Sequence, residues 1–333
     1  MSSDNHQIQA ARKFIQDQYP EIPVPDKSYF IMMIPRTGSN LLASHLENIR
    51  FGHPIEAFHF NHRRMQKTYQ WNIDFSDPVA HLRKAIEFQT VDGVFGMKLN
   101  WQQLESFLKT TQQIIEPSGI TLNNRDLFEV FFPEASFIYM KRLGKIKQAV
   151  SFSKGMQTGI WKERVGEEET YKDYVLPPLY DRAHIEGCLE ELLSYDVSWE
   201  NFLKTNGFQY LELWYEDLAK EYVETIKKVY AHLGIERDDI PEPALKKQAN
   251  LKSQDWAARF TEETPWVNQK IVSEALERGD FLSAFILRGT EIIHQKEQKR
   301  WHAMPATRFK PVRWFFFRAD KKLSAILRPK AQE

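Results

Sequence analysis

The chain has 333 residues, of which 42% are hydrophobic and 27% charged, a composition ordinary for a globular protein with a sizeable core. Its 45 Lys and Arg residues balance 45 Asp and Glu residues, which excludes a global attraction to polyanions, so any anion site has to be built locally. The single Cys188 excludes a disulfide framework and a multi-cysteine metal site, and with a polar N-terminus and no membrane-length apolar run it predicts a cytoplasmic protein.

The first predicted elements lead into a short loop. Residues 1–27 form a polar N-terminal segment with a helix expected over 10–18, followed by prolines that favour an extended chain. Residues 29–34 are an unbroken apolar run, which predicts a strand buried on both faces of a parallel sheet. The helical spacing of the next apolar residues predicts a helix that begins near Ser39.

The loop between this strand and this helix reads PRTGSN over residues 35–40. Gly38 lets the backbone approach a ligand closely, Arg36 supplies charge, and the free N–H groups of the helix start attract anions. Further hydrogen-bonding side chains come from Thr37, Ser39 and Asn40. The loop lacks the G-x-x-x-x-G-K-[ST] pattern of kinases and GTPases, so it predicts another kind of phosphate or sulfate site. A surface turn with an incidental arginine is the alternative.

Three more apolar runs predict buried strands, each followed by a helix. The strands are expected over 91–101, 135–140 and 208–213. Helices are expected from 101 to 109 and from 185 to 203, and the Gly/Pro-containing residues 51–62 are expected to form a loop beside the ligand. The alternation predicts an α/β fold with a parallel β-sheet flanked by helices.

An ordered set of motifs spans about residues 29 to 260. Its positions are Arg36, Thr37, Gly38, Ser39, Leu41, Leu42, Glu56, Phe58, Gly93, Gly96, Lys98, Leu99, Trp101, Arg142, Gln148, Ala149, Val150, Ser151, Gln157, Thr158, Trp161, Tyr215, Gln248, Ala249, Ser253, Asp255, Trp256 and Arg259. The set resembles the sulfotransferases that use 3′-phosphoadenosine-5′-phosphosulfate (PAPS), and more narrowly the bacterial trehalose 2-sulfotransferase family. The resemblance implies a P-loop-like nucleotide-binding sulfotransferase fold, with the domain over 28–290.

The resemblance also implies how PAPS is bound. The 5′-phosphosulfate is assigned to the first loop, through Arg36, Thr37, Gly38, Ser39 and Asn40. Arg142 at a strand end and Ser151 on the next helix are assigned to the 3′-phosphate, which suits a guanidinium fork. Trp256 is assigned to stacking on adenine or to capping the site. A surface ion pair is the alternative for Arg142, and packing is the alternative for Trp256.

Sulfuryl transfer is an in-line displacement in which the acceptor oxygen attacks sulfur and the nucleotide phosphate leaves. Charge on the transferred oxygens calls for positioned cations, and Arg36 and Lys98 are the candidates. A structural strand-end lysine is the alternative for Lys98. The resemblance assigns the general base to Glu56, just after a Gly-x-Pro turn.

The expected acceptor is a carbohydrate or glycolipid hydroxyl. Besides Glu56, the residues assigned to it are His53, His59, Trp101 and Trp161. The family pattern has an acid where this chain has His53, in the sugar-binding region, which argues against trehalose itself. Three loop histidines (His62 included) could suggest a metal, but sulfuryl transfer needs none and no Cys or carboxylate pair joins them, so we expect no metal site.

Residues 291–333 form a basic and aromatic C-terminal extension. Residues 296–330 contain eleven Lys and Arg residues but only two acidic residues, and six Trp and Phe residues are interleaved with them. This composition fits association with anionic lipid at the inner membrane face. Docking on the protein itself or on a second subunit, as in a homodimer, is the alternative. No nucleic-acid module accompanies the basic residues, so no nucleic acid partner is expected.

Two other classes of function stay open beside the predicted PAPS-dependent sulfotransferase. A catalytically silent nucleotide- or glycan-binding adaptor would share the fold, but drift in such a protein should remove the base first. A phosphoryl-transfer enzyme would need a Gly-Lys-Ser/Thr loop and a magnesium-holding Asp after a strand, and the sequence offers neither.

Overall fold

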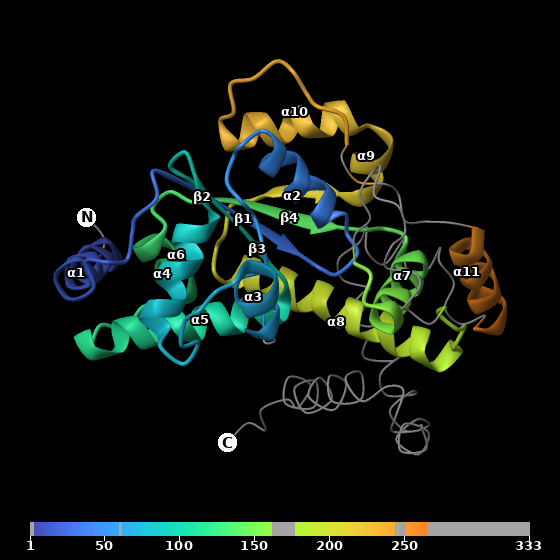
Figure 1. The fold of residues 1–333 in the computed structure, drawn as a ribbon, viewed down its shortest axis with the longest axis horizontal. Coiled ribbons are helices and arrows are strands. Elements are labelled where there is room, and N and C mark those ends of the chain that lie inside the picture. The colour runs from blue at the N-terminus through green and yellow to red at the C-terminus, as the bar shows by residue number, and fades with distance from the viewer. Residues whose placement is uncertain (1–2, 60–61, 162–176, 244, 246–250, 265–333) are drawn as a thin grey trace. The chain divides into compact units, whose positions relative to one another are not determined.

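The computed structural model describes residues 3–59, 62–161, 177–243, 245 and 251–264. The chain divides into two compact units, Met1–Leu143 with Ser198–Lys247 and Gly144–Val197 with Gln248–Glu333. The sheet lies in the first unit, with helices on both of its faces (Figure 1).

The sheet has the strand order β2-β3-β1-β4-β5. Its strands are β1 Lys27–Met33, β2 Thr90–Val91, β3 Val94–Leu99, β4 Ser136–Lys141 and β5 Leu211–Trp214. All neighbours pair in parallel except β2 and β3, so the predicted helix-flanked α/β fold is confirmed. The strand predicted over 91–101 is shorter and begins after a hairpin turn, since Asp92 and Gly93 have φ of 50° and 79°.

The helices include those predicted. The first unit holds α1 Ser3–Gln18, α2 Ser39–Asn48, α3 His62–Tyr69, α4 Pro78–Gln89, α5 Trp101–Ile115, α6 Asn124–Phe131, α9 Tyr215–Lys220 and α10 Tyr222–Leu233, with a 3-10 turn at Glu116–Ser118. The second holds α7 Lys145–Thr158 and α11 Leu251–Glu263, and α8 Arg182–Thr205 crosses the division. Helix α2 begins at the predicted Ser39, and α5 runs beyond the predicted end at 109 because Phe107 and Ile114 continue its buried face.

Strand β1 is buried on both faces, as its unbroken apolar run predicts. Tyr29, Ile31 and Met33 pack in one core with side chains of α2, α9 and α10. Phe30 points to the opposite face, where its ring meets Phe128 edge-on at 4.9 Å. The centre of the sheet therefore has no surface for a ligand, and the site has to lie at a strand end.

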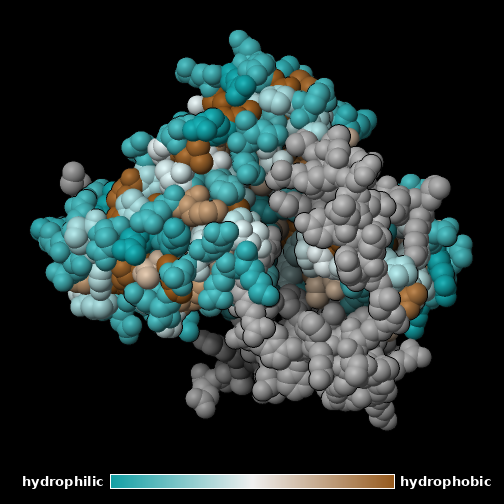
Figure 2. Space-filling model, in the orientation of Figure 1, coloured by the Kyte–Doolittle hydropathy of each residue, from teal (hydrophilic) through white to brown (hydrophobic). Residues whose placement is uncertain are grey.

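The described surface has no extended apolar region in the view of Figure 2, where apolar side chains occur in scattered spots on a hydrophilic face. No helix of the described residues combines the length and the apolar character needed to cross a bilayer. The extension over 291–333, including the basic and aromatic residues 296–330, lies outside the described residues.

Candidate functional site

The carboxyl ends of the parallel strands meet at one edge of the sheet. Met32 of β1 is in register with Leu99 of β3, and Met33 with Met140 of β4. The chain passes from β1 to β3 on one side and then to β4 on the other, so the strand order reverses beside β1. Ligands of open α/β sheets bind outside the carboxyl ends at such a reversal. The loops after β1 and β4 are therefore the expected ligand loops.

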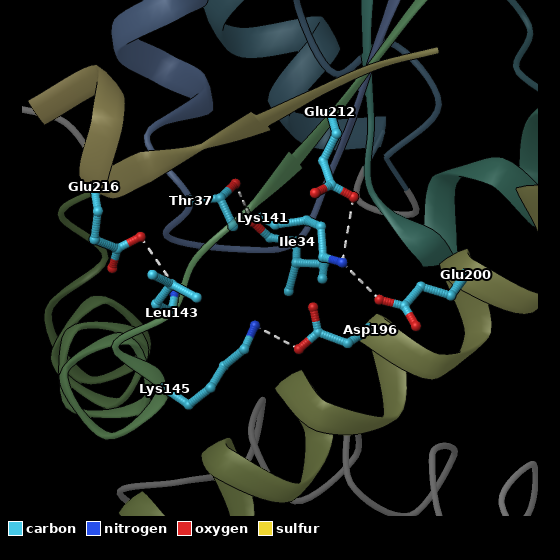
Figure 3. Close-up of polar contacts among 9 residues, drawn as sticks. All are labelled: Ile34, Thr37, Lys141, Leu143, Lys145, Asp196, Glu200, Glu212 and Glu216. Carbon is cyan, nitrogen blue, oxygen red and sulfur yellow. Dashed lines mark hydrogen bonds and ion pairs between the residues drawn. The ribbon is translucent and has the colours of Figure 1, made fainter. Parts of the chain in front are cut away.

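The loop after β1 folds tightly around its own backbone. Arg36 and Gly38 have φ of 69° and 81°, which turns the chain sharply before α2. Thr37 is fully buried, and its hydroxyl donates to the carbonyl of Ile34 at 2.8 Å (Figure 3). In this structure the Thr37 hydroxyl thus stabilises the loop itself.

The start of helix α2 has no capping side chain at its N-cap. Gly38 is the N-cap and offers no side-chain hydrogen bond, while its carbonyl accepts from the N–H groups of Leu41 and Leu42. The N–H groups of Ser39 and Asn40 precede these bonds, in the first turn of the ten-residue helix. Together with the helix dipole they favour a bound negative charge.

Tyr215 connects this loop to the end of β4. A Cβ added to Gly38 would lie 2.8 Å from Cδ2 of Tyr215, so the ring packs directly against the loop. The guanidinium of Arg142 lies 4.3 Å from the centroid of the same ring. Nη1 of Arg142 donates to the carbonyl of Arg36 at 2.8 Å. One arginine therefore braces the left-handed loop while it stacks on Tyr215.

Arg142 is buried and keeps unused hydrogen-bonding capacity. It is 8% exposed, and burial lowers its pKa while the charges of Tyr215 and Glu216 act in the opposite direction. Its Nε is buried without a hydrogen-bond partner among the described residues. Glu216 accepts from the N–H of Leu143 at 3.0 Å (Figure 3). A buried guanidinium with a donor to spare suits an oxyanion better than the alternative of a surface ion pair.

The neighbouring Lys141 has a different environment. Its Nζ lies 2.8 Å from Glu200 and 3.5 Å from Glu212 (Figure 3). It also lies 4.8 Å from the centroid of the Trp214 ring. These contacts tie β4 to β5 and to the last turns of α8. Lys141 therefore stabilises the sheet, and Arg142 is the basic residue of this strand end that remains for a ligand.

Lys98 is the centre of a buried polar network. It is 5% exposed, and its Nζ lies 2.5 Å from Oδ1 of Asn40 and 3.1 Å from Oε1 of Glu56. The other carboxylate oxygen of Glu56 accepts from Nε2 of Gln103 at 2.8 Å. The network joins the first turn of α2, the loop that carries Glu56, the end of β3 and the start of α5. Lys98 thus bridges two predicted site residues, Asn40 and Glu56, and its part in catalysis stays a prediction.

Of the three loop histidines, His53 and His59 were assigned to the acceptor, and ring contacts are described for His53 and His62. His53 packs 5.0 Å from the Phe88 ring, with its Nε2 3.5 Å from Glu47. His62 stacks on Phe75 at 4.3 Å, and burial lowers its pKa. His59 is half-buried. No group of three His, Cys, Asp or Glu side chains suited to a metal occurs within the described ranges.

Trp101 begins α5 next to this network and packs inward. Its ring meets Trp199 edge-on at 5.5 Å and Phe202 at 6.1 Å. These neighbours come from the last part of α8, within the first unit. Packing accounts for the position of Trp101, and its predicted contact with an acceptor has no further observation behind it.

Three of the predicted ligand residues belong to the second unit. Ser151 lies half-buried on α7. Trp161 packs against Phe152, and Trp256, 6% exposed, meets Tyr180 edge-on at 5.8 Å. The same unit contains a fully buried ion pair between Lys145 of α7 and Asp196 of α8, which ties these helices together (Figure 3).

Two residues of the site were not assigned a role from the sequence. Tyr215 was noted as part of the motif set, but nothing in its surroundings in sequence indicates a contact with Gly38. Gln103 was not singled out at all. Its position follows from Asn100, which caps α5 by accepting from the Gln103 N–H at 3.0 Å. Recognising that cap would have placed Gln103 in the first helical turn at the carboxyl edge of the sheet.

Comparison with known proteins identifies the family. The chain is 27% identical over 195 residues to a trehalose 2-sulfotransferase of Mycobacterium tuberculosis, covering 58% of this chain and 70% of that protein. It is 23% identical over 256 residues to the trehalose 2-sulfotransferase of Mycolicibacterium smegmatis, covering 70% and 94%. A solved sulfotransferase domain from the Synechococcus PCC 7002 olefin synthase matches 73% of this chain and 98% of its own, at 15% identity and a TM-score of 0.36. The profile of the Stf0 sulphotransferase family matches residues 28–263, and the chain therefore belongs to this family.

Proposed function

We propose that the protein transfers the sulfuryl group of PAPS to a hydroxyl of a carbohydrate or glycolipid, with Glu56 as the general base. The observation that carries the proposal is the network around Lys98. One ammonium group contacts both Asn40, at the open start of α2, and Glu56, the candidate base. The Lys98 ammonium would therefore lie between an anion bound at the loop and the proton acceptor Glu56.

The donor is assigned to the first loop and to Arg142. The N–H groups at Ser39 and Asn40, with the charge of Arg36, would hold the phosphosulfate. Arg142 would offer to the 3′-phosphate its Nε, which has no hydrogen-bond partner among the residues that the structure describes. The assignments of Ser151 to the same phosphate and of Trp256 to adenine rest on the family resemblance alone.

The reaction needs a base and stabilisation of negative charge. The acceptor oxygen forms a bond to sulfur, the bond from sulfur to the nucleotide phosphate breaks, and the acceptor proton passes to Glu56. Among the described contacts, Asn40 and Glu56 use two of the three donors of Lys98. Its charge and remaining donor, with Arg36, would stabilise the oxygens of the transferred group.

A sugar is the acceptor class that the relatives favour, since both are named trehalose 2-sulfotransferase. The acceptor would meet Glu56, His53 and His59, with Trp101 and Trp161 as less supported contacts. Because His53 stands where the family pattern has an acid, trehalose is one sugar to test among several. Association of residues 296–330 with a membrane, a homodimer and a cytoplasmic location remain predictions.

Calorimetric titration with 3′,5′-adenosine bisphosphate, with AMP and ATP as controls, tests the donor. We expect binding that requires the 3′-phosphate and weakens strongly in Arg142→Ala. The exposed Arg50, which pairs with Asp92, provides the matched control Arg50→Ala. ATP binding as tight as that of the bisphosphate would contradict the donor assignment.

Transfer of labelled sulfuryl from PAPS to a panel of sugars and glycolipids tests the reaction. Glu56→Gln should keep nucleotide binding and lose about 100- to 10,000-fold in turnover, the usual effect of a general base. Glu116→Gln, an exposed change at the end of α5, should have no effect. A fully active Glu56→Gln protein would remove Glu56 as the base. Nucleotide binding without transfer to any acceptor or to water would favour the silent adaptor.

A further inference from the structure

We infer that Gln103 is a positioning residue that orients the carboxylate of Glu56 for proton abstraction. The inference rests on the proposed function, in which Glu56 is the base. It concerns a contact that the family resemblance does not cover, because Gln103 lies outside the motif set.

The burial of Gln103 is the first part of the argument. The residue is 1% exposed on the face of α5 whose next members, Leu104 and Phe107, are core side chains. Burying an amide without hydrogen bonds costs about 1–3 kcal/mol. The side chain of Gln103 donates to Oε2 of Glu56 at 2.8 Å, while its Oε1 has no partner among the described residues. Glu56 is therefore the described contact that accounts for a polar group at this core position.

The contact fixes the plane of the carboxylate. Lys98 holds Oε1 at 3.1 Å and Gln103 holds Oε2 at 2.8 Å, so these two described side chains approach opposite oxygens of the carboxylate. With Lys98 alone, the group could rotate about its last bond. With both donors its orientation is set, and these two bonds do not exhaust the capacity of the group, since a carboxylate accepts about four hydrogen bonds.

Both donors are mounted on one rigid segment. Lys98 is the penultimate residue of β3, Asn100 caps α5, and Gln103 lies in the first helical turn, with its N–H bound to Asn100. The loop of Glu56 is attached to the same strand, because Ile55 forms a parallel bridge with Met97 and its carbonyl accepts from the Lys98 N–H at 3.1 Å. The base and its two donors therefore move together.

The chemistry of the side chain fits a positioning role. A second cation beside Glu56 would hold its negative charge more strongly and make the carboxylate a poorer proton acceptor. A neutral amide such as that of Gln103 orients the Glu56 carboxylate by a hydrogen bond and stabilises its negative charge less than a cation would. The pair of Lys98 and Gln103 thus keeps one positive charge beside Glu56 and uses the amide for geometry.

Gln103→Met tests the inference, because methionine keeps the length and packing of the side chain and removes the donor. Gln113→Met, at an exposed position of the same helix, is the matched control. The assay measures transfer of labelled sulfuryl from PAPS to trehalose, to the other sugars of the panel and to water. We expect kcat to fall about 10- to 100-fold in Gln103→Met, as for a misplaced reacting group, with KM for PAPS and affinity for 3′,5′-adenosine bisphosphate within about twofold of wild type.

The double variant separates positioning from general damage. If Gln103 acts through Glu56, Gln103→Met should cause no further loss of kcat in the Glu56→Gln protein. Equal losses in both backgrounds, or a wild-type kcat in Gln103→Met, would overturn the inference while leaving Glu56 as the base. An active Glu56→Gln protein, or a wild type that releases no sulfuryl even to water, would instead overturn the proposed function and this inference with it.

Discussion

Replacing Gly38 with alanine tests whether the anion loop depends on its backbone shape. Gly38 has φ of 81° and ψ of 9°, and this left-handed conformation costs an L-residue about 1–2 kcal/mol. The new Cβ would also lie 2.8 Å from Cδ2 of Tyr215, so the ring has to move away from Arg142. A disturbed cation–π contact costs about 0.5–2 kcal/mol. The combined effect is about 1.5–4 kcal/mol.

This cost is divided between folding and binding. If the loop of Gly38→Ala keeps the wild-type shape, the strain lowers the free energy of unfolding. If the loop relaxes to another shape, the protein loses affinity for the nucleotide. Urea unfolding and calorimetric titration with 3′,5′-adenosine bisphosphate should together account for the sum. If all of it falls on binding, the affinity drops about 10- to 1,000-fold.

Gly119→Ala provides the matched control for Gly38→Ala. Gly119 has φ of 70°, and a Cβ there would meet no atom within 4 Å. The control should therefore lose only the backbone part, about 1–2 kcal/mol of unfolding free energy, with unchanged nucleotide affinity. A total loss in Gly38→Ala no larger than that in Gly119→Ala would refute the role given to the Tyr215 contact.

Two predictions concern pH and stability. Burial raises the pKa of Glu191 from 4.5 to about 8, so the folded protein keeps a proton that the unfolded chain releases, and stability falls as the pH rises from about 4.5 to 8. Glu191→Gln should unfold at higher urea than wild type at pH 8, with a difference of about 3 kcal/mol already at pH 7; equal midpoints would contradict this. Burial, assisted by the charge of Arg237, lowers the pKa of His45 to about 4. As the pH drops, the unfolded chain therefore takes up the proton before the folded protein does. Stability falls by roughly 3 kcal/mol between about pH 6.5 and pH 4. His45→Gln should lose less stability than wild type over that range. Part of the loss should remain, because burial also lowers the pKa of His81 to about 4. A dependence of stability on pH like that of wild type would exclude His45 as a cause.

Local sequence patterns were enough to predict the centre of the fold. The apolar run that became β1 has a strand's length and leaves no polar face, so a buried central strand was the natural interpretation. Loop and helix start followed from Gly38 and from the helical spacing after Ser39. Arg142 was placed at a strand end because β4 is equally apolar. Parallel strands then bring these ends to one edge of the sheet without further information.

Other features depend on contacts that a linear pattern does not contain. The strand predicted over 91–101 included a hairpin turn because Asp92-Gly93 was read as part of an apolar run, although this dipeptide favours such turns. Thr37 looks like a ligand donor in sequence, yet its hydroxyl binds the Ile34 carbonyl. The contact of Tyr215 with Gly38 joins residues far apart in the chain. The contact forms only in the folded sheet, where β5, which precedes Tyr215, pairs with β4.

In the proposed mechanism a cation, Lys98, and a base, Glu56, share one site, and the network around Lys98 bears on how they can. A cation beside Glu56 stabilises its charge and so weakens it as a base in the resting protein, which opposes catalysis. Lys98 is also bound to Asn40, however, at the turn where the donor's negative charge would arrive. An anion at that turn would offset part of the positive charge that Lys98 presents to Glu56, while Lys98 and Gln103 keep the carboxylate in place. In the proposed mechanism Glu56 would thus accept a proton more readily when PAPS is bound. Acceptor and PAPS should therefore depend on each other for productive binding.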